Sequence, residues 1–439
     1  MQRSRVVLFV VLSLAAIVPL RNYDLFWHLA TGRWIVEHRA LPASDPFAVA
    51  SDRGPWINGE WLFDVAIAPI GFNALTILRA LIVAAMFAFA TRDPVIASIA
   101  FAGANPLCDM RPSTIGAAFA AMAIAIARRS WIAFAILTAV WINVHPSALL
   151  APVIMLVLTR SIPHTFASFA ALFVNPFGWR AIAAPVSLNA FVTSGAIANA
   201  EWQRSSPLVF PILYITIVAG VVLLWRKRAE LVLFAMFAIL AILHVRHQPL
   251  YFAAMPLLFP SIDWKKWATI VTAAIITLAF FTIPHGLGLL DPRWPIAATA
   301  RLKSTQLKGN IYNPDQFGGL LIWSFYPERR ALTDGRNELY RTYNAEYAVA
   351  HNDESAWRAL LAKYKIDLAL DEYRRERVTV VDAITKQKTR KPASLVYWPR
   401  AQWALIGYDD VGMLFVRRAA FPPEVLQRWE LRDVVPDAR

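Results

Sequence analysis

Acidic and histidine side chains gather in one polar stretch near the N-terminus, residues 21–61. Asp24 and His28 are four positions apart, so they share a face if this segment is helical. Asp45 and Glu60 follow in the same stretch. Carboxylates in such a group can take a proton from an acceptor hydroxyl or hold a divalent cation. The alternative is structural: Asp24 caps a helix and His28 is a polar residue at a membrane interface.

Further ionisable residues stand at the ends of apolar runs, where an unpaired charge is costly and often marks a site. Arginine suits a phosphate ligand because its guanidinium group can donate two parallel hydrogen bonds. The alternative for each residue is a helix-to-helix ion pair or a side chain that reaches the membrane interface. The candidates for substrate binding in these positions are Arg111, His145, Glu201, Arg246 and His247.

The composition indicates which elements carry these residues. Hydrophobic residues make up 57% of the 439 positions and charged residues 17%, whereas about a quarter of a typical soluble domain is charged. Apolar runs fill the chain from about residue 6 to 281, and an ordinary water-soluble sequence begins near Arg301. We therefore expect a polytopic α-helical membrane protein that carries a soluble domain at its C-terminal end.

The positions of the basic residues set the expected topology. The net charge is +14, but the cations bunch at the ends of apolar runs, as at Arg128 and Arg129, which is typical of cytoplasmic loops and not of a nucleic-acid-binding face. This pattern predicts an N-terminus in the cytoplasm, a C-terminal domain outside, and about eleven spans. They lie near residues 6–20, 62–91, 93–105, 113–127, 131–144, 147–159, 164–175, 207–224, 229–246, 249–262 and 266–284.

The expected domains follow from these spans. Residues 1–284 form the transmembrane domain, with external loops at 21–61 and 176–206, and residues 285–439 form a small external α/β domain. Within the latter, a turn is expected at Gly318 and Gly319. Strands are expected at 366–370, 394–397, and in a hairpin at 403–408 and 412–416. Asp334 and Arg336 flank a glycine, which predicts a turn with an internal ion pair.

The first 65 residues resemble the GT-C superfamily of membrane glycosyltransferases, in which an acidic residue just after the first span holds the catalytic role. Asp24 matches that position, and Leu41-Pro42 with Asp45-Pro46-Phe47 resembles the second half of the family's first external loop. The expected order of many spans and then an external domain also matches. Leu25 and Phe26 follow Asp24 where the family often has a second acid, so the use of a metal stays open. The segment around Asp334 and Arg336 is similar to one in the external domains of bacterial relatives, which implies that it faces the active-site cleft and makes both residues further candidates for substrate binding.

The resemblance implies transfer of a sugar from a polyprenyl-phosphate donor to an external glycan, lipid or protein acceptor, at the inner membrane of a bacterium. Asp24 would be the base, oriented by His28, Glu60 or Asp45. Arg111, His145, Arg246 or His247 would hold the donor phosphate. No cofactor is assigned, with a divalent cation as the open alternative. The rival hypothesis is a non-catalytic envelope protein that assists polysaccharide biosynthesis.

Overall fold

The computed structural model describes residues 2–193, 200–374, 377–381 and 385–438. Two compact units divide the chain. The helical unit comprises residues 1–22, 31–41 and 57–289, and the sheet unit comprises residues 23–30, 42–56 and 290–439. Two short segments from the N-terminal polar stretch therefore belong to the same unit as the C-terminal third of the chain.

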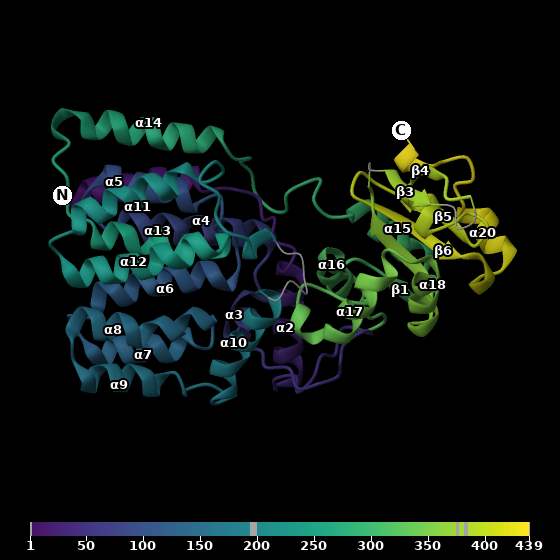
Figure 1. Ribbon diagram of the computed structural model, residues 1–439, viewed down its shortest axis with the longest axis horizontal. Helices are drawn as coiled ribbons and strands as arrows, with labels where there is room; N and C mark the ends of the chain where they lie inside the picture. Colours follow the sequence, from purple (N-terminus) through teal and green to yellow (C-terminus); the bar gives the residue numbers. More distant parts are fainter. Residues whose placement is uncertain (1, 194–199, 375–376, 382–384, 439) are drawn as a thin grey trace. The chain divides into compact units, whose positions relative to one another are not determined.

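Helices that run side by side make up most of the helical unit (Figure 1). Alanine-rich faces allow close packing, with Ala97, Ala100 and Ala117 fully buried between α5, α6 and their neighbours. The helices are α1 (Gln2–Ala15), α3 (Trp61–Ile67), α4 (Phe72–Ala88), α5 (Pro94–Ala104), α6 (Pro112–Ile126), α7 (Trp131–Trp141), α8 (Ala151–Thr159), α9 (Ile162–Ala171), α10 (Arg180–Thr193), α11 (Pro211–Leu224), α12 (Arg228–Leu243), α13 (Gln248–Leu258) and α14 (Ala268–Phe281). The helix α2 (Leu25–His38) begins in the sheet unit and ends in the helical unit.

Each apolar run of the sequence contains at least one of these helices, but the eleven expected spans are not confirmed. In the described part of the chain, no helix combines the length and the apolar character that crossing a membrane requires. The runs are broken: residues 68–71, with Pro69 and Gly71, separate α3 from α4. The run at 147–159 starts in a 3-10 helix, Pro146–Leu150, and α8 follows it with nine residues.

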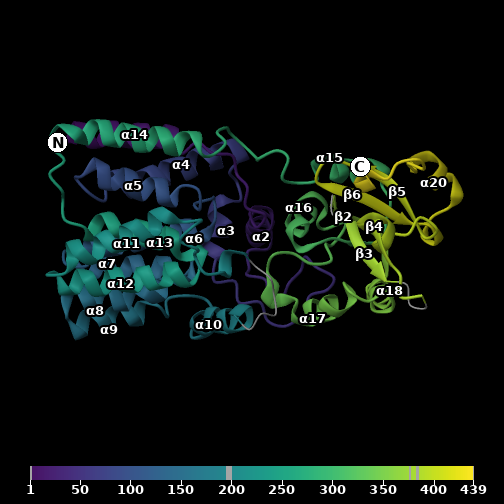
Figure 2. The ribbon, with the colours of Figure 1, turned by 45° about the horizontal axis from the view of Figure 1, so that its top comes forward.

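A four-stranded sheet forms the centre of the sheet unit, in the order β1-β2-β6-β5. The strand β1 (Asn310–Tyr312) is parallel to β2 (Ile366–Glu372), while β6 (Gly412–Arg417) is antiparallel to both β2 and β5 (Trp403–Tyr408). Figure 2 shows β5 and β6 side by side, so the hairpin expected there is confirmed. A separate pair of strands consists of β3 (Arg377–Val381) and β4 (Lys388–Pro392).

Short helices surround this sheet, and two of them differ from the sequence predictions. Residues Ala393–Tyr397 form the helix α19 instead of a strand, where Asp437 accepts hydrogen bonds from the backbone and hydroxyl of Ser394. The pair Gly318 and Gly319, expected in a turn, lies inside α16 (Asp315–Phe325). The others are α15 (Ile296–Thr305), α17 (Arg341–Ala350), α18 (Glu354–Lys363) and α20 (Pro423–Trp429).

Residues 47–50 run beside residues 331–332 in the sheet unit. Ala48 forms a parallel bridge with Ala331, and the backbone N–H of Val49 donates to the carbonyl oxygen of Ala331 at 2.9 Å. The N–H of Ala50 donates to Leu332 at 3.0 Å. This pairing brings the acidic N-terminal stretch close to the turn that starts at Asp334.

Candidate functional site

The turn from Asp334 to Arg336 is built around the ion pair that the sequence predicts. The Oδ1 atom of Asp334 accepts from the backbone N–H of Arg336 at 2.9 Å and from its Nε at 2.8 Å. Arg336 Nη2 donates to the second carboxylate oxygen. Short polar side chains favour such turns because they can bind the backbone two residues further on.

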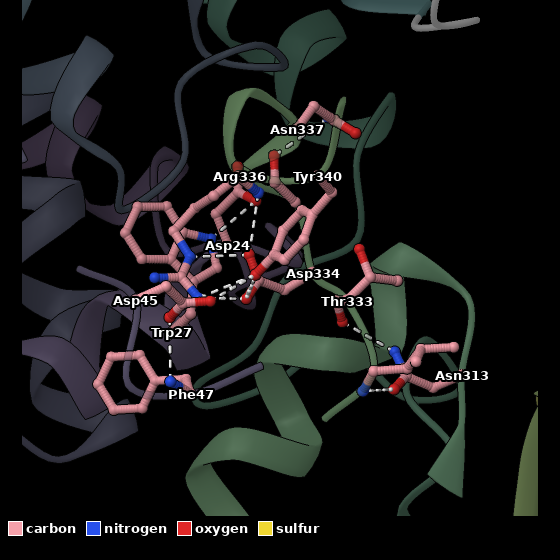
Figure 3. Close-up of polar contacts among 12 residues, drawn as sticks. Asp24, Trp27, Asp45, Phe47, Asn313, Thr333, Asp334, Arg336, Asn337 and Tyr340 are labelled. Atoms are coloured by element: carbon pink, nitrogen blue, oxygen red, sulfur yellow. Dashed lines mark hydrogen bonds and ion pairs between the residues drawn. The ribbon is translucent and has the colours of Figure 1, made fainter. Parts of the chain in front are cut away.

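Asp45 joins this ion pair from the N-terminal stretch (Figure 3). Its Oδ1 lies 3.0 Å from Arg336 Nη2 and accepts from the N–H of Phe47, also at 3.0 Å. The hydroxyl of Tyr340 lies 3.2 Å from Asp45 Oδ2 and 2.7 Å from Asp334 Oδ2. Both oxygens of Asp45 are therefore engaged in holding the loop to the turn.

The cation of this cluster is enclosed by protein. Burial alone would disfavour the charged form of Arg336, but Asp334 and Asp45 more than offset it and raise the pKa of the guanidinium well above its usual value. Burial also raises the pKa of Tyr340, which keeps its hydroxyl neutral. The guanidinium carbon lies 4.5 Å from the ring centre of Trp56, with Phe47 and Trp27 at 5.4 and 5.5 Å. Cation–π attraction from three rings adds to the two carboxylates.

Asp24 lies against the same turn. It directly precedes α2, and its Oδ1 accepts from Trp27 Nε1 at 3.1 Å. A Cβ atom on Gly335 would stand only 2.3 Å from that oxygen, so a side chain at this position would displace the carboxylate. Gly319 of α16 allows the start of α2 to approach as well, because a Cβ at this position would meet the carbonyl oxygen of Tyr23 at 3.0 Å. The candidate base therefore shares one neighbourhood with the Asp334 turn.

His28 follows one turn later on α2. Its backbone N–H donates to the carbonyl oxygen of Asp24 at 3.1 Å, as the first turn of a helix requires. The side chain is buried, and its ring lies 3.7 Å, centre to centre, from that of Trp27. The segment is helical, and the ring of His28 packs at a tilt of 31° against that of Trp27, whose indole N–H donates to Asp24.

Further carboxylates surround Asp24 in the sheet unit. Burial of the carboxyl group, together with the charges of Asp24, Asp334 and Glu372, raises the pKa of Asp315 to about 6, although the residue keeps a solvent-exposed edge. The N–H of Gln316 partly opposes this shift by donating to Asp315 Oδ1 at 2.8 Å. A carboxyl group that titrates near neutral pH is thus added to the predicted set.

Glu60 and His145 meet in the helical unit. His145 Nε2 lies 4.0 Å from Glu60 Oε1, and Nδ1 accepts from the backbone N–H of Ser147 at 3.1 Å. Because Nδ1 is an acceptor, the neutral ring carries its proton on Nε2, the atom nearer Glu60. The next residue, Trp61, donates from Nε1 to Asn143 at 2.8 Å, which fixes α3 beside the end of α7.

The other candidates for phosphate binding in the helical unit fall into two groups, Arg111 with Glu201 and Arg246 with His247. Arg111 donates to Glu201 at 2.6 Å, which is an ion pair between segments. The guanidinium carbon of Arg246 lies 4.4 Å from the ring centre of Trp202. Burial, with the charge of Arg246 next, lowers the pKa of His247 to about 4. His247 is therefore neutral at pH 7 and can contribute a hydrogen bond but no charge.

Asp45 and Asp334 do not form a site for a divalent cation. Asp45 and Asp334 already share the guanidinium of Arg336, and a second cation there would be repelled by it. Within the described ranges, no group of three or more histidine, cysteine, aspartate or glutamate side chains is arranged to hold a metal ion.

Several residues of this cluster were not predicted from the sequence: Tyr340, Trp27, Trp56, Gly335 and Asp315. Tyr340 stands four positions after Arg336. This spacing suggests a contact only if the residues between them are helical, and the sequence predicts no helix there. Trp27 gave a clearer signal, since it is three residues after Asp24 on a predicted helix.

No protein-family model matches the sequence, and no curated protein sequence is significantly similar to it. Solved structures are similar in fold. An Archaeoglobus fulgidus oligosaccharyltransferase tethered to an acceptor peptide matches with a TM-score of 0.54 and 10% identity, over 88% of this chain and 74% of that one. The apo form matches with a TM-score of 0.50 and 10% identity, over 85% and 70% of the two chains.

A third structure, an A. fulgidus oligosaccharyltransferase complex with Zn and sulfate, has a TM-score of 0.49 and 11% identity, over 87% of this chain and 72% of that one. The first two comparisons extend over most of the chain, including both units. At this identity they show the fold alone. The chain therefore has a fold similar to that of this oligosaccharyltransferase.

Proposed function

We propose that this chain is a membrane glycosyltransferase that moves a sugar from a polyprenyl-phosphate donor to an external glycan, lipid or protein acceptor, with Asp24 as the base. One observation carries the proposal. The Asp24 carboxylate lies against the Asp334–Arg336 turn, within a chain whose fold matches that of an oligosaccharyltransferase. The resemblance of the first 65 residues points to the same aspartate.

The proposed step forms one bond and breaks one. The acceptor oxygen attacks the anomeric carbon of the donor sugar while Asp24 takes the acceptor proton, and the bond to the lipid phosphate breaks with its electron pair on the phosphate oxygen. Phosphate is a good leaving group, so the protein mainly positions the acceptor and stabilises the departing charge. Arg111, His145, Arg246 and His247 remain the candidates for holding that phosphate.

The contacts within the sheet unit support different roles for Asp24 and Asp45. Asp24 receives the indole N–H of Trp27, an arrangement that orients a carboxylate. Asp45 is engaged by Arg336, Tyr340 and Phe47, an arrangement that anchors a loop. We therefore assign Asp45 to positioning, and keep His28 and Glu60 as the candidates that orient the reacting groups.

A location in the bacterial inner membrane, with the N-terminus in the cytoplasm and the C-terminal domain outside, belongs to the same proposal. Large apolar side chains on the outer faces of the helices support it. Ile215, Val218 and Val222 of α11 are 67–72% exposed and stand on one helical face, and Phe281 of α14 is 80% exposed. Membrane lipids would cover these faces, and the lipid-linked donor would enter from the same environment.

The test compares glycan and lipid profiles of a deletion strain complemented with wild type, Asp24→Asn or Asp410→Asn. Asp410 is an exposed aspartate in the β5–β6 turn, so the second variant makes the same chemical change away from the site. We expect Asp24→Asn to abolish transfer at unchanged protein abundance and Asp410→Asn to restore it. A wild-type profile with Asp24→Asn would reject the base assignment and favour a non-catalytic role in envelope polysaccharide assembly.

A further inference from the structure

A cavity of about 970 Å³ is lined only by residues of the sheet unit, and neither Asp24 nor the Asp334–Arg336 turn is among them. Its wall is formed by the end of α15, the following residues 306–310, and the end of α16 with residues 327–330. The volume is near the upper end of the ~300–1,000 Å³ typical of small-molecule sites. The cavity therefore has room for a ligand much larger than a single inorganic ion.

The charge of this cavity is strongly positive. Lys303, Lys308, Arg329 and Arg330 line it, against the single carboxylate of Glu328. In the part of the chain that the structure describes, none of these four cations forms an ion pair. Elsewhere in the same unit, cations such as Lys363 and Arg417 are paired with carboxylates. Like charges that gather in a concave wall without counter-ions attract anions.

Arg329 shows how the cationic wall is held in place. Its Nη1 donates to the carbonyl oxygen of Gly309 at 3.2 Å, and its Nη2 donates to that of Leu307. Both partners are neutral, so the positive charge is not cancelled. Gly309 has a φ of +130°, and a Cβ there would meet Asp367 at 2.9 Å, so the loop can bend around the guanidinium only with glycine at this position.

The rest of the wall is mixed in character. Phe325 and Leu307 present apolar surface, while Asn310 and Ser324 provide an amide and a hydroxyl. A sugar ring combines apolar C–H faces with hydroxyl groups and fits this combination, and the surplus of cations requires an acidic substituent. We propose that the cavity binds an anionic carbohydrate, a sugar that carries a phosphate or a carboxylate group. This site does not depend on the proposed transfer reaction.

The test is isothermal titration calorimetry on the full chain with four probes: glucose 6-phosphate, glucuronate, glucose and inorganic phosphate. We expect saturable binding of one or both anionic sugars, weaker binding of phosphate, and none of glucose. Lys303→Gln/Lys308→Gln should weaken that binding about tenfold, since it removes two exposed cations. The matched control, Lys388→Gln/Lys391→Gln, removes two exposed lysines from β4 and should leave affinity unchanged.

Three outcomes would overturn the site. Phosphate could bind as tightly as both anionic sugars, both lysine pairs could weaken binding equally, or no probe could bind. All four lysines are exposed, so folding of both variants is expected and is checked by thermal unfolding; Arg330→Gln provides a second variant. Asp24→Asn should bind the sugars like wild type, so a failure of the transfer proposal leaves this inference standing, and the reverse also holds.

Discussion

Asp24 and Asp45 are the same residue type in the same polar stretch, yet their surroundings give them different chemistry. Asp45 is bound to a buried cation and to a neutral tyrosine hydroxyl. A carboxylate held in this way anchors its loop, because moving it would break the ion pair with the buried guanidinium. Asp24 is half-buried and is oriented by an indole N–H.

Gly335 offers a way to move Asp24 without removing it. Gly335→Ala places a methyl group 2.3 Å from Asp24 Oδ1, so the carboxylate must shift. The contact is with the end of a flexible side chain, so the effect on folding should be small. We expect transfer to fall on the order of 100-fold, the cost of misplacing a catalytic group by about 1 Å. The measurement is the glycan profile, with thermal unfolding in parallel.

The control for this variant is Gly54→Ala, in the same unit, where no heavy atom lies within 4 Å of the added methyl group. It should leave both readouts unchanged. If Gly335→Ala kept wild-type transfer, the position of Asp24 against this turn would have no role in the reaction.

The raised pKa of Asp315 predicts that the stability of the folded protein depends on pH. Its pKa of about 6 in the folded state exceeds the value of 3.8 in the unfolded chain, so the folded state holds the proton more tightly. The carboxylate therefore destabilises the fold progressively as pH rises from about 4 to about 6. We expect Asp315→Asn to raise Tm above pH 6 and to lose this advantage near pH 4. The exposed edge of Asp315 screens the charge, so a modest difference is expected.

Thermal unfolding of both proteins across that pH range checks the prediction. A constant Tm difference at every pH would mean that the substitution acts through packing or hydrogen bonding, and that the charge of Asp315 has no part in it.

At the scale of elements, one aspartate fixes two segments of the helical unit. Asp93 Oδ1 accepts from the N–H groups of Val95 and Ile96 and so caps α5, while Oδ2 accepts from the N–H of Ile262 and from Trp264 Nε1, both at 3.0 Å. Asp93→Ala should lower the free energy of unfolding by about 2–4 kcal/mol, the sum of a lost cap and two lost hydrogen bonds to part-buried donors.

A matched comparison is Ser130→Ala, which removes only the cap of α7, where Oγ accepts from Ala133 at 3.2 Å. Ser130→Ala should lower the free energy of unfolding by about 1 kcal/mol. Chemical denaturation of the two variants measures the difference. Equal losses would show that the link to residues 262–264 adds nothing to the free energy of unfolding.

The elements that the sequence predicts well are those whose signals are local. The hairpin of β5 and β6 has two apolar strands joined by a polar turn, and all its information lies within residues 403–417. The strand predicted at residues 394–397 was wrong, because the apolar residues there have the composition of a strand but form the helix α19. The backbone of Ser394 at its start donates to Asp437, which is 43 residues away and lies outside any local pattern. The expected spans overlap real helices, but proline, glycine and 3-10 turns shorten them, which apolar composition does not reveal.

The candidate site divides in the same way. The Asp334–Arg336 turn could be predicted because both partners of the ion pair are two residues apart. Its link to Asp45 could not, since no local pattern encodes a partner at that distance in the chain. The packing of Trp27 and Trp56 around Arg336 could not be predicted from the sequence either. Aromatic residues near a first apolar run are equally typical of a membrane interface.

At the scale of the whole molecule, the proposed membrane location can be tested on α11. Val218→Lys/Val222→Lys puts two charges on its exposed face. If lipid covers this face, each lysine costs about 2.5–3.5 kcal/mol at the centre of a bilayer, and the chain should be lost from carbonate-washed membranes. Val381→Lys, at a half-exposed valine of β3, should leave the membrane fraction unchanged. Full retention of the double-lysine variant would argue against a lipid-facing α11.

The hydrogen bond between Tyr340 and Asp45 joins residues that are 295 positions apart, which has a consequence for biosynthesis. A ribosome adds about 5–20 residues per second, so Asp45 waits on the order of 15–60 seconds for its partner. During that time Trp27, Phe47 and Trp56 have no guanidinium to enclose. The nascent loop is then a target for holding factors or proteases, and a stop codon anywhere before Arg336 would leave it permanently in that state.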